Sequence, residues 1–356
     1  MIADDPEASA AFIAALEADD LDGVRRAPKG EAHTHGPFGG DRAFLAERTG
    51  RDIVPLTAPL TALAEMDAWT AANVADLFKG RDGRRLGWEG AFARARRDGL
   101  TRVAFGDDVW MITQDVGDAA ELFAGIEAAR QAIAPEIDWI PQLGFSRHCK
   151  RSWLWHWLTP FLEAGRWRAL DLSGEEHAQP IAVFQPLYRA CKAQGLRLKA
   201  HVGEWGTADD VWRAVETLEL DEVQHGIAAA DSPAVMRFLA DHAIPLNVCP
   251  TSNLLLGRVA RLEDHPIRAL YDAGVRVTIN SDDALVFGVG VSEEFLALHR
   301  AGVFTAAELD RIRRWSLEDA PPLRERIAAL RNNGPERPPK GLDADKAFFD
   351  DLSGEP

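Results

Sequence analysis

Short apolar runs alternate with longer amphipathic segments along most of this chain. Eight apolar runs are predicted as strands, and they cover residues 31–35, 102–105, 137–144, 169–172, 196–202, 222–225, 245–249 and 275–279. Apolar residues recur every three or four positions in the other segments, which is the period of a helix. The clearest of these segments are residues 15–27, 208–220, 232–243, 265–274 and 292–302. Strands joined through helices of this length pair in parallel and form a buried sheet.

The repeated strand–helix unit predicts a (β/α)8 TIM barrel that occupies residues 1–331 as a single domain. An open, doubly wound sheet of six or seven strands is the alternative, because periodicity alone does not separate the two architectures. Residues 37–99 are long for one connection and partly helical, so they are predicted as a helical lid insertion after the first strand. Residues 332–356 are rich in Pro, Gly and charge and are predicted as a loosely packed C-terminal tail.

Charge and cysteine content narrow the function classes. The chain has 40 basic and 56 acidic residues, a net charge of -16, which argues against broad nucleic-acid binding and against binding an anionic membrane. Cys149, Cys191 and Cys249 have no close spacing, so neither a disulfide framework nor a Cys-x-x-Cys metal site is predicted. The acidic N-terminus is unlike a signal peptide, and no apolar run approaches about 18 residues. We expect a cytoplasmic protein with a small-molecule substrate, and a homo-oligomer is left open.

Polar side chains with metal-binding or acid–base chemistry gather where the predicted strands end. They are His33, His35, His201, Glu204, His225, Asp282 and Asp283. His33 and His35 alternate on one predicted strand and therefore point to the same side. The carboxyl ends of parallel barrel strands meet at one end of the barrel, so these side chains are expected to converge. Imidazole and carboxylate ligands suit zinc with one open position for water, which makes His33, His35, His201 and Asp282 the candidate ligands.

The remaining polar residues acquire roles from their positions. Glu204 follows His201 by three residues, where it can donate a proton to a substrate atom beside the attacked one. His225 is expected either to accept a proton from the activated water or to hold the nucleophile in orientation. Asp283 is expected to meet substrate. A solvated loop acid for Glu204 and a helix N-cap for Asp283 are the structural alternatives.

Six short motifs, taken in order, resemble the signature of the adenosine deaminase branch of the metal-dependent amidohydrolase superfamily. They are PKGEAHTH (28–35), KAHVGE (199–204), QHG (224–226), CPTSN (249–253), HP (265–266) and NSDD (280–283). The segment DLSGEE (171–176) also resembles the fourth-strand segment of the family. The resemblance extends from residue 28 to about residue 300 and implies a TIM barrel that binds one zinc ion.

The resemblance also implies a reaction, in which metal-bound hydroxide attacks the amino-bearing carbon of a purine or purine-like ring and ammonia is released. It implies that Glu204 protonates ring N1 and that Asp283 faces N7. His225 and Asp282 act with the metal, and Gly174 offers its backbone amide to N3. The alternatives are a deaminase of adenine or another aminated heterocycle without ribose recognition, an amidohydrolase that cleaves a cyclic amide, and an inactive binding protein. Another divalent ion in place of zinc is left open, because ligand type alone does not exclude it.

One residue departs from the family pattern. Nucleoside deaminases of the family have an aspartate that contacts the ribose 5′-hydroxyl at the position of Pro37, and a proline ring cannot accept that hydrogen bond. Ribose recognition is therefore in question. Phe38 and Trp205 are expected to line an aromatic substrate slot. The tryptophan-rich segment 147–167 is interpreted as helix packing or a subunit contact, with a stacking surface or lid as the alternative.

Overall fold

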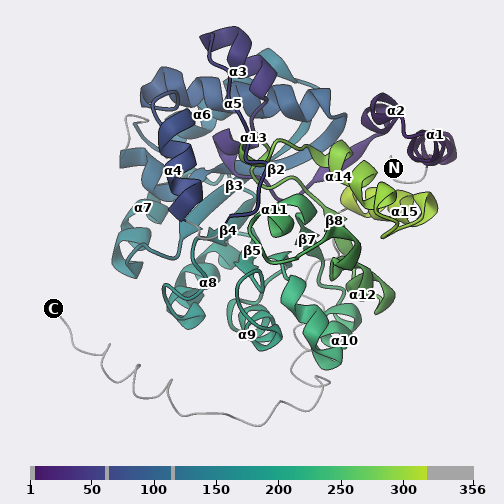
Figure 1. The fold of residues 1–356 in the computed structure, drawn as a ribbon. Coiled ribbons are helices and arrows are strands. Elements are labelled where there is room, and N and C mark those ends of the chain that lie inside the picture. The colour runs from purple at the N-terminus through teal and green to yellow at the C-terminus, as the bar shows by residue number, and fades with distance from the viewer. Residues whose placement is uncertain (1–4, 61–63, 114–116, 319–356) are drawn as a thin grey trace.

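The computed structural model describes residues 5–60, 64–113 and 117–318 (Figure 1). Its strands are β1 (Lys29–Glu31), β2 (Leu100–Asp108), β3 (Asp138–Ser146), β4 (Ala169–Ser173), β5 (Arg197–Val202), β6 (Glu222–His225), β7 (Leu246–Val248) and β8 (Val277–Ile279). They lie side by side in sequence order, and every neighbouring pair is parallel. An isolated parallel bridge between Thr34 and Asp282 joins the two ends of the sheet. The TIM barrel prediction is confirmed, and the open sheet is excluded because its first and last strands would not meet.

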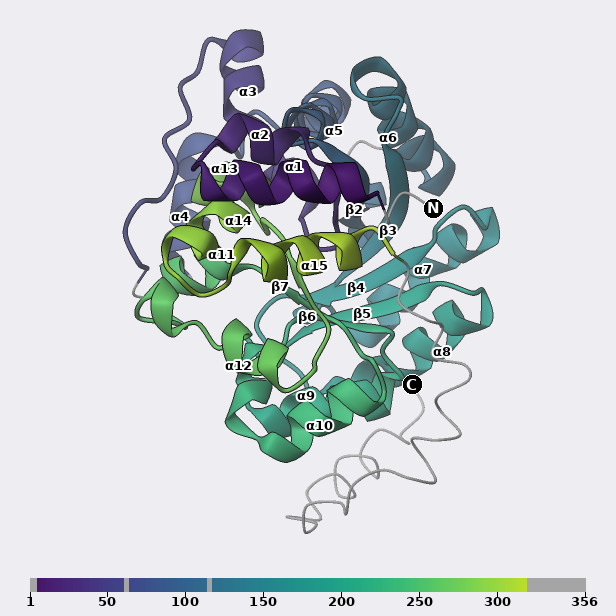
Figure 2. The same ribbon diagram turned by 90° about the vertical axis from the view of Figure 1, so that its right-hand side faces the viewer.

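Helices surround the barrel (Figures 1 and 2). The α-helices are α1 (Pro6–Glu17), α2 (Leu21–Arg26), α3 (Arg42–Thr49), α4 (Ala64–Asn73), α5 (Gly80–Arg97), α6 (Ala119–Ile133), α7 (Arg151–Ala164), α8 (Gln185–Ala193), α9 (Ala208–Leu218), α10 (Pro233–Asp241), α11 (Pro250–Leu255), α12 (Ile267–Asp272), α13 (Ala284–Phe287), α14 (Val291–Arg300) and α15 (Ala306–Ser316). Short 3-10 helices are η1 (Gly36–Gly39), η2 (Val109–Thr113), η3 (Ile181–Phe184), η4 (Ile227–Asp231) and η5 (Leu262–Asp264). The segment predicted as one helix over 15–27 is two, because Asp19 adopts a left-handed conformation (φ 57°) that ends α1.

The main core lies between the outward faces of the strands and the helices. Val103 and Phe105 on β2, and Leu143 and Phe145 on β3, alternate with inward-facing positions and are buried in this core. A second, smaller apolar cluster joins residues of α4, α11 and α13 with Phe38 and Trp205. The barrel therefore separates an apolar outer layer from a polar interior that leads to its mouth.

The first strand is shorter than predicted and lies earlier in the chain. Glu31 is the last residue of β1 that pairs with β2. Beyond it the chain leaves β2 and pairs with the segment after β8, where the Asp282 N–H donates to the His33 carbonyl at 3.3 Å. The predicted strand over 31–35 was therefore wrong in its bounds. His33 and His35 are held by the closure of the barrel, not by a strand ladder.

The predicted lid range, residues 37–99, contains α3, α4 and α5. Of these, α5 packs against β2 and α6 within the ring of helices around the barrel, whereas α3 and α4 precede it in the connection. The predicted tail, residues 332–356, lies outside the described residues. The domain bounds given above stay a prediction.

A buried group of charged residues lies between β1 and α5, and we call it the wall ion cluster: Lys29, Glu31, Arg94 and Asp98. Arg94 donates a hydrogen bond to Glu31 and lies 3.8 Å from the Asp98 carboxylate. The Lys29 ammonium donates to the Asp98 carbonyl at 2.7 Å. The two cations of this cluster match its two carboxylates, as buried charges require.

Candidate metal centre and active site

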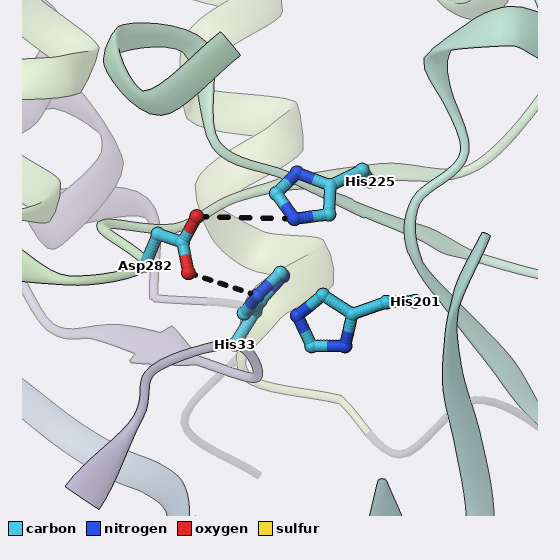
Figure 3. Close-up of side chains that lie close together, drawn as sticks. All are labelled: His33, His201, His225 and Asp282. Atoms are coloured by element: carbon cyan, nitrogen blue, oxygen red, sulfur yellow. Dashed lines mark ion pairs between the residues drawn. The ribbon is translucent and has the colours of Figure 1, made fainter. Parts of the chain in front are cut away.

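Four side chains that are distant in the sequence converge at the carboxyl ends of the strands: His33, His201, His225 and Asp282 (Figure 3). His35 joins them through Asp282. His33 Nε2 and His35 Nε2 lie 3.2 and 3.1 Å from Asp282 Oδ1. His35 Nε2 also lies 3.1 Å from His201 Nε2. His225 Nε2 is 3.8 Å from Asp282 Oδ2, on the other side of the carboxylate. All four predicted ligands thus lie together. We call them, with His225, Glu204 and Asp283, the mouth cluster.

The partners of the ring Nδ1 atoms show which nitrogens are free to bind a metal. His33 Nδ1 lies 3.2 Å from the carbonyl of Asn247, and His201 Nδ1 lies 3.2 Å from Asp171 Oδ1. Both partners only accept hydrogen bonds, so each ring carries its proton on Nδ1 and its lone pair on Nε2. Such a partner behind the ring is the usual support of a metal-binding histidine.

The lone pairs of the mouth cluster face one another and a carboxylate. His33 Nε2 is buried and makes no hydrogen bond of good geometry, although Asp282 Oδ1 lies 3.2 Å away. Lone pairs that converge on an anion repel one another unless a cation lies between them. The donor set of three imidazoles and one carboxylate therefore fits a divalent metal such as zinc.

The electrostatics of the cluster agree with this fit. Burial raises the pKa of Asp282, but the neighbouring His33 and His35 outweigh burial and hold it well below its usual value. Burial lowers the pKa of His35, yet Asp283 and Asp282 together raise it to about 10. The carboxylates thus favour positive charge at the position where the ring nitrogens meet.

Two residues of this site adopt backbone conformations that are rare for side chains other than glycine. His225 (φ 59°), at the end of β6, and Asp282 (φ 58°), just after β8, are both left-handed. Such a conformation costs about 1–3 kcal/mol per residue and persists where the surrounding structure enforces it. The strain lies at two residues whose side chains point into the mouth cluster.

Glu204 and Asp283 are carboxyl groups that face imidazoles rather than Lys or Arg side chains. Glu204 Oε2 lies 3.6 Å from His225 Nε2, and one carboxyl oxygen of each residue is buried without a hydrogen bond. Burial, together with the charges of Asp282 and Glu176, raises the pKa of Glu204 well above its usual value. Burial and the charge of Asp282 raise the pKa of Asp283 to about 7, although the charge of His35 lowers it. Both shifts favour the protonated form of the carboxyl group.

The loop that presents Glu204 is held by a residue to which the sequence assigned no role. The Glu176 carboxylate accepts hydrogen bonds from the backbone N–H groups of Gly203, Glu204 and Trp205 at 2.9, 2.7 and 2.7 Å. Arg147 donates to the carbonyls of Glu176 and His201, both at 2.6 Å. Glu176 belongs to the motif DLSGEE, but an acceptor for backbone amides has no spacing pattern that would mark it.

Asp282 is also fixed from behind. The Ser252 hydroxyl donates to Asp282 Oδ2 at 2.7 Å, and Ser252 is fully buried. Ser252 lies in the motif CPTSN, which carried the resemblance without an individual role.

A cavity of about 910 Å³ opens onto the mouth cluster. The predicted substrate residues Gly174, Asp283, Trp205 and Phe38 all line it, together with Pro37. Residues of α4, among them Met66 and Thr70, line the same cavity. The lid and substrate-contact roles stay predictions, but the residues concerned surround one space.

The tryptophan-rich segment faces elsewhere. Trp167 is buried in the main core, and Trp155 and Trp157 pack against that core. Trp153, also on α7, is 52% exposed. None of the four lines the cavity. The stacking-surface interpretation therefore has no support at the site.

Among residues 5–60, 64–113 and 117–318, no helix has the length and apolar character needed to cross a bilayer.

Comparisons with known proteins show which family the chain resembles. Residues 148–332, just over half of the chain, match the sequence profile of a family described as "Adenosine deaminase". A "Putative adenosine/adenine deaminase" of Treponema pallidum is 42% identical over 164 residues, which cover 46% of this chain and 55% of that protein. An "Adenine deaminase" of Crocosphaera subtropica is 38% identical over 145 residues, 41% of this chain and 44% of that protein. The aligned segments thus span about half the length of these relatives.

Solved structures share the fold. The adenine deaminase of Arthrobacter aurescens superimposes with a TM-score of 0.69 over 86% of this chain and 97% of its own, at 24% identity. A zinc-bound amidohydrolase of Burkholderia ambifaria superimposes with a TM-score of 0.70 over 94% of each chain, at 23% identity.

Proposed function

The chain belongs to the adenosine deaminase family, and from this membership we propose that it is a metal-dependent hydrolytic deaminase. It replaces an exocyclic amino group of a purine or purine-like ring with oxygen and releases ammonia. One observation carries the proposal: three imidazole Nε2 atoms and the Asp282 carboxylate converge beside Glu204, a buried acid whose pKa burial raises.

His33, His35, His201 and Asp282 would hold one zinc ion. When bound, zinc acts as a Lewis acid that makes a water oxygen nucleophilic near neutral pH. The zinc in the Burkholderia ambifaria structure supports this choice of metal. Another divalent ion with the same ligand preference is the alternative.

Three residues of the chain transfer a proton or donate a hydrogen bond to the ring: Glu204, Asp283 and Gly174. Glu204 donates a proton to the ring nitrogen beside the attacked carbon, which keeps negative charge from developing on the ring. Protonated Asp283 donates a hydrogen bond to a second ring nitrogen, N7 in a purine, and the Gly174 N–H donates to N3. A water oxygen adds to the amino-bearing carbon, the C–N bond breaks, and the amino group leaves as ammonia with one proton from the water. The ring nitrogen keeps the proton from Glu204, and the second water proton returns to Glu204.

The substrate is proposed to be an adenine ring, either free or as a nucleoside. Pro37 stands where family nucleoside deaminases have an aspartate, and its ring packs so closely on α5 that a Cβ at Gly87 would lie 2.6 Å from it. The proline side chain offers no acceptor for a ribose hydroxyl. The relatives named as adenine deaminases support the free base as first choice.

We propose further that the protein is cytoplasmic, acts on a small molecule without a nucleic-acid or membrane partner, and is able to form a homo-oligomer. The composition and the charge of -16 support the first two statements.

The decisive experiment is an ammonia-release screen of the metal-loaded protein over adenine, adenosine, ring-modified relatives, aminated pterins and pyrimidines. We expect release from adenine or adenosine. Metal analysis accompanies the screen. A protein that takes up no divalent ion would be an inactive binding protein, and one that binds metal yet hydrolyses only cyclic amides would overturn the deaminase proposal.

A further inference from the structure

A chain of buried polar side chains lies behind His225, on the side of the ring away from Asp282. It consists of Asn253 on α11 and His265, which directly precedes Pro266 and α12. Asn253 Nδ2 lies 3.2 Å from His225 Nδ1, and Asn253 Oδ1 lies 3.3 Å from His265 Nε2. All three side chains are at most 2% exposed, so their hydrogen bonds have no competition from solvent.

The direction of these hydrogen bonds is fixed from the far end of the chain. The backbone N–H of Ile267 donates to His265 Nδ1 at 3.1 Å. A backbone N–H only donates, so His265 Nδ1 carries a lone pair and the ring proton lies on Nε2. Burial lowers the pKa of His265 to about 3, which keeps the ring neutral. His265 Nε2–H therefore donates to Asn253 and must meet the oxygen of its amide.

The amide nitrogen of Asn253 then faces His225. An amide NH2 group only donates, so His225 Nδ1 accepts, and the neutral ring carries its proton on Nε2. We propose that Asn253 and His265 are positioning residues that hold His225 in the Nε2–H tautomer and so make it a hydrogen-bond donor toward the active site. That proton lies on His225 Nε2, which is 3.6 Å from Glu204 Oε2 and 3.8 Å from Asp282 Oδ2.

The tautomer selects between the two roles that the sequence left open for His225. A protonated Nε2 orients the attacking oxygen by donating to it, but it cannot accept a proton from that oxygen. The lone pair of the ring is on Nδ1 and faces Asn253. A proton released at the site therefore passes to a carboxylate, either Asp282 or Glu204 after Glu204 has protonated the ring, and not to His225. This catalytic consequence rests on the proposed function, whereas the tautomer itself does not.

His265 also has a structural role, because its Nδ1 caps the Ile267 N–H in the first turn of α12. Two substitutions separate the roles. His265→Asn places an amide oxygen near the former Nδ1 and keeps the cap, but loses the donor to Asn253. His265→Gln reaches the former Nε2 position and keeps that donor, but loses the cap. Asn253→Asp presents a carboxylate oxygen to His225 and favours the opposite tautomer, Nδ1–H.

The test is a two-bond ¹H–¹⁵N correlation spectrum of the full-length, zinc-loaded protein labelled with ¹⁵N-histidine. The His225 signals are assigned by their loss in His225→Gln. We expect the Nε2–H pattern in the wild type and in His265→Gln, a mixture in His265→Asn, and Nδ1–H in Asn253→Asp. An Nδ1–H pattern in the wild type, or an unchanged pattern in Asn253→Asp, overturns the proposal. If the variants do not fold, the wild-type spectrum still decides.

Steady-state kinetics provide the second readout. For His265→Asn we expect kcat to fall about 10- to 100-fold, the usual cost of losing an outer-shell partner, with KM unchanged. Asn253→Asp should lose more, since a wrong catalytic tautomer costs up to about 10⁴ in turnover in serine proteases. His265→Gln should regain most of the loss. Equal losses in His265→Asn and His265→Gln would show a purely structural role. If no purine is deaminated, the spectra still test the tautomer, so the two proposals fail separately.

Discussion

The mouth cluster and the wall ion cluster are both buried in the same barrel, but they balance charge differently. In the wall ion cluster, Arg94 and Lys29 lie beside the acids that they neutralise. Burial raises the pKa of Asp98 even so, but Lys29 and Arg94 oppose that shift. In the mouth cluster, Glu204, Asp282 and Asp283 meet only imidazoles, and burial raises the pKa of Glu204 and Asp283. The charges of the wall ion cluster balance one another without any further group. The mouth cluster has three carboxyl groups and no Lys or Arg, as expected of a site that a metal and a substrate complete.

Two adjacent residues of α14 show the same difference. Glu293 forms an ion pair with Arg25 near the wall ion cluster, and this partner outweighs burial and lowers its pKa. Glu294 is fully buried on the mouth side, where its carboxyl group accepts from the Thr251 N–H, and burial raises its pKa to about 8. Neighbouring carboxyl groups thus respond to the presence or absence of a cation.

Removing the metal should have the largest effect on activity and stability, because only the mouth cluster is proposed to bind it. A chelator is expected to abolish ammonia release and to lower Tm, because a ligand at about 1,000 times its Kd adds about 4 kcal/mol to the free energy of unfolding. Calorimetry with and without zinc, alongside metal analysis, measures both. Asp282→Asn should lose this metal dependence. If the protein contains metal but its Tm does not change when the chelator is added, the metal is not bound in the mouth cluster.

The next largest effect is expected from Glu204→Gln. This change removes the proton donor but leaves every proposed metal ligand in place, so turnover should fall about 10²- to 10⁴-fold with full metal content. Ammonia release and metal analysis of the same sample check it. The control is Glu216→Gln on the exposed face of α9, which should retain full turnover. Undiminished ammonia release by Glu204→Gln would show that another group protonates the ring.

In the wall ion cluster, the expected effect is on stability. Arg94→Met leaves Glu31 buried without its cation, and only Lys29 remains for the two carboxylates, so the free energy of unfolding should fall by about 3–5 kcal/mol. Urea denaturation measures the loss. Arg96→Met is the matched control, because Arg96 pairs with Glu136 at the surface and such pairs contribute about 0–1 kcal/mol. Equal losses in the two variants would remove the distinction between a buried and an exposed pair.

The smallest predicted effect is a pH dependence that differs between Glu293 and Glu294. The folded-state pKa of Glu294 is about 8, above its usual value of 4.5. Between pH 4.5 and 8 the folded protein therefore keeps a proton that the unfolded chain releases. Wild-type stability should therefore fall as pH rises from 6 towards 8, by at most about 1.4 kcal/mol per pH unit from this group. In Glu294→Gln that contribution is absent, so Tm measured across this range should fall less.

Glu293→Gln is the contrasting variant. The lowered pKa of Glu293 means that its stabilising contribution is fully present above the unfolded value of 4.5. Its loss should lower Tm by the same amount at every pH between 6 and 8. Parallel Tm profiles for the wild type and Glu294→Gln would contradict the raised pKa of Glu294.

The fold and the proposed ligands could be predicted from the sequence because both leave a pattern along the chain. Buried parallel strands give apolar runs, and residues at their carboxyl ends must meet, so His201 and Asp282 were identified from position and residue type. The end of β1 was not identified, because the closing contacts of Thr34 with Asp282 replace the strand ladder there.

The supporting residues lie within recognised motifs, but the sequence did not mark their individual roles. Glu176 binds three backbone amides, and Asn253 and His265 bind one another through side-chain atoms. Backbone amides are present at every position, so a side chain that binds them has no recognisable partner in the sequence. These contacts become visible only when the loops after β4, β5 and β7 are placed in space.

The bridge between Thr34 and Asp282 also sets the order of events during synthesis. About 250 residues separate His33 from Asp282, and they emerge from the ribosome at about 5–20 residues per second. For on the order of 10–50 s the nascent chain therefore presents the first two histidines without the carboxylate that completes their set. The proposed metal site is thus complete only late in synthesis, and a chain that ends before β8 has most of the barrel but lacks Asp282.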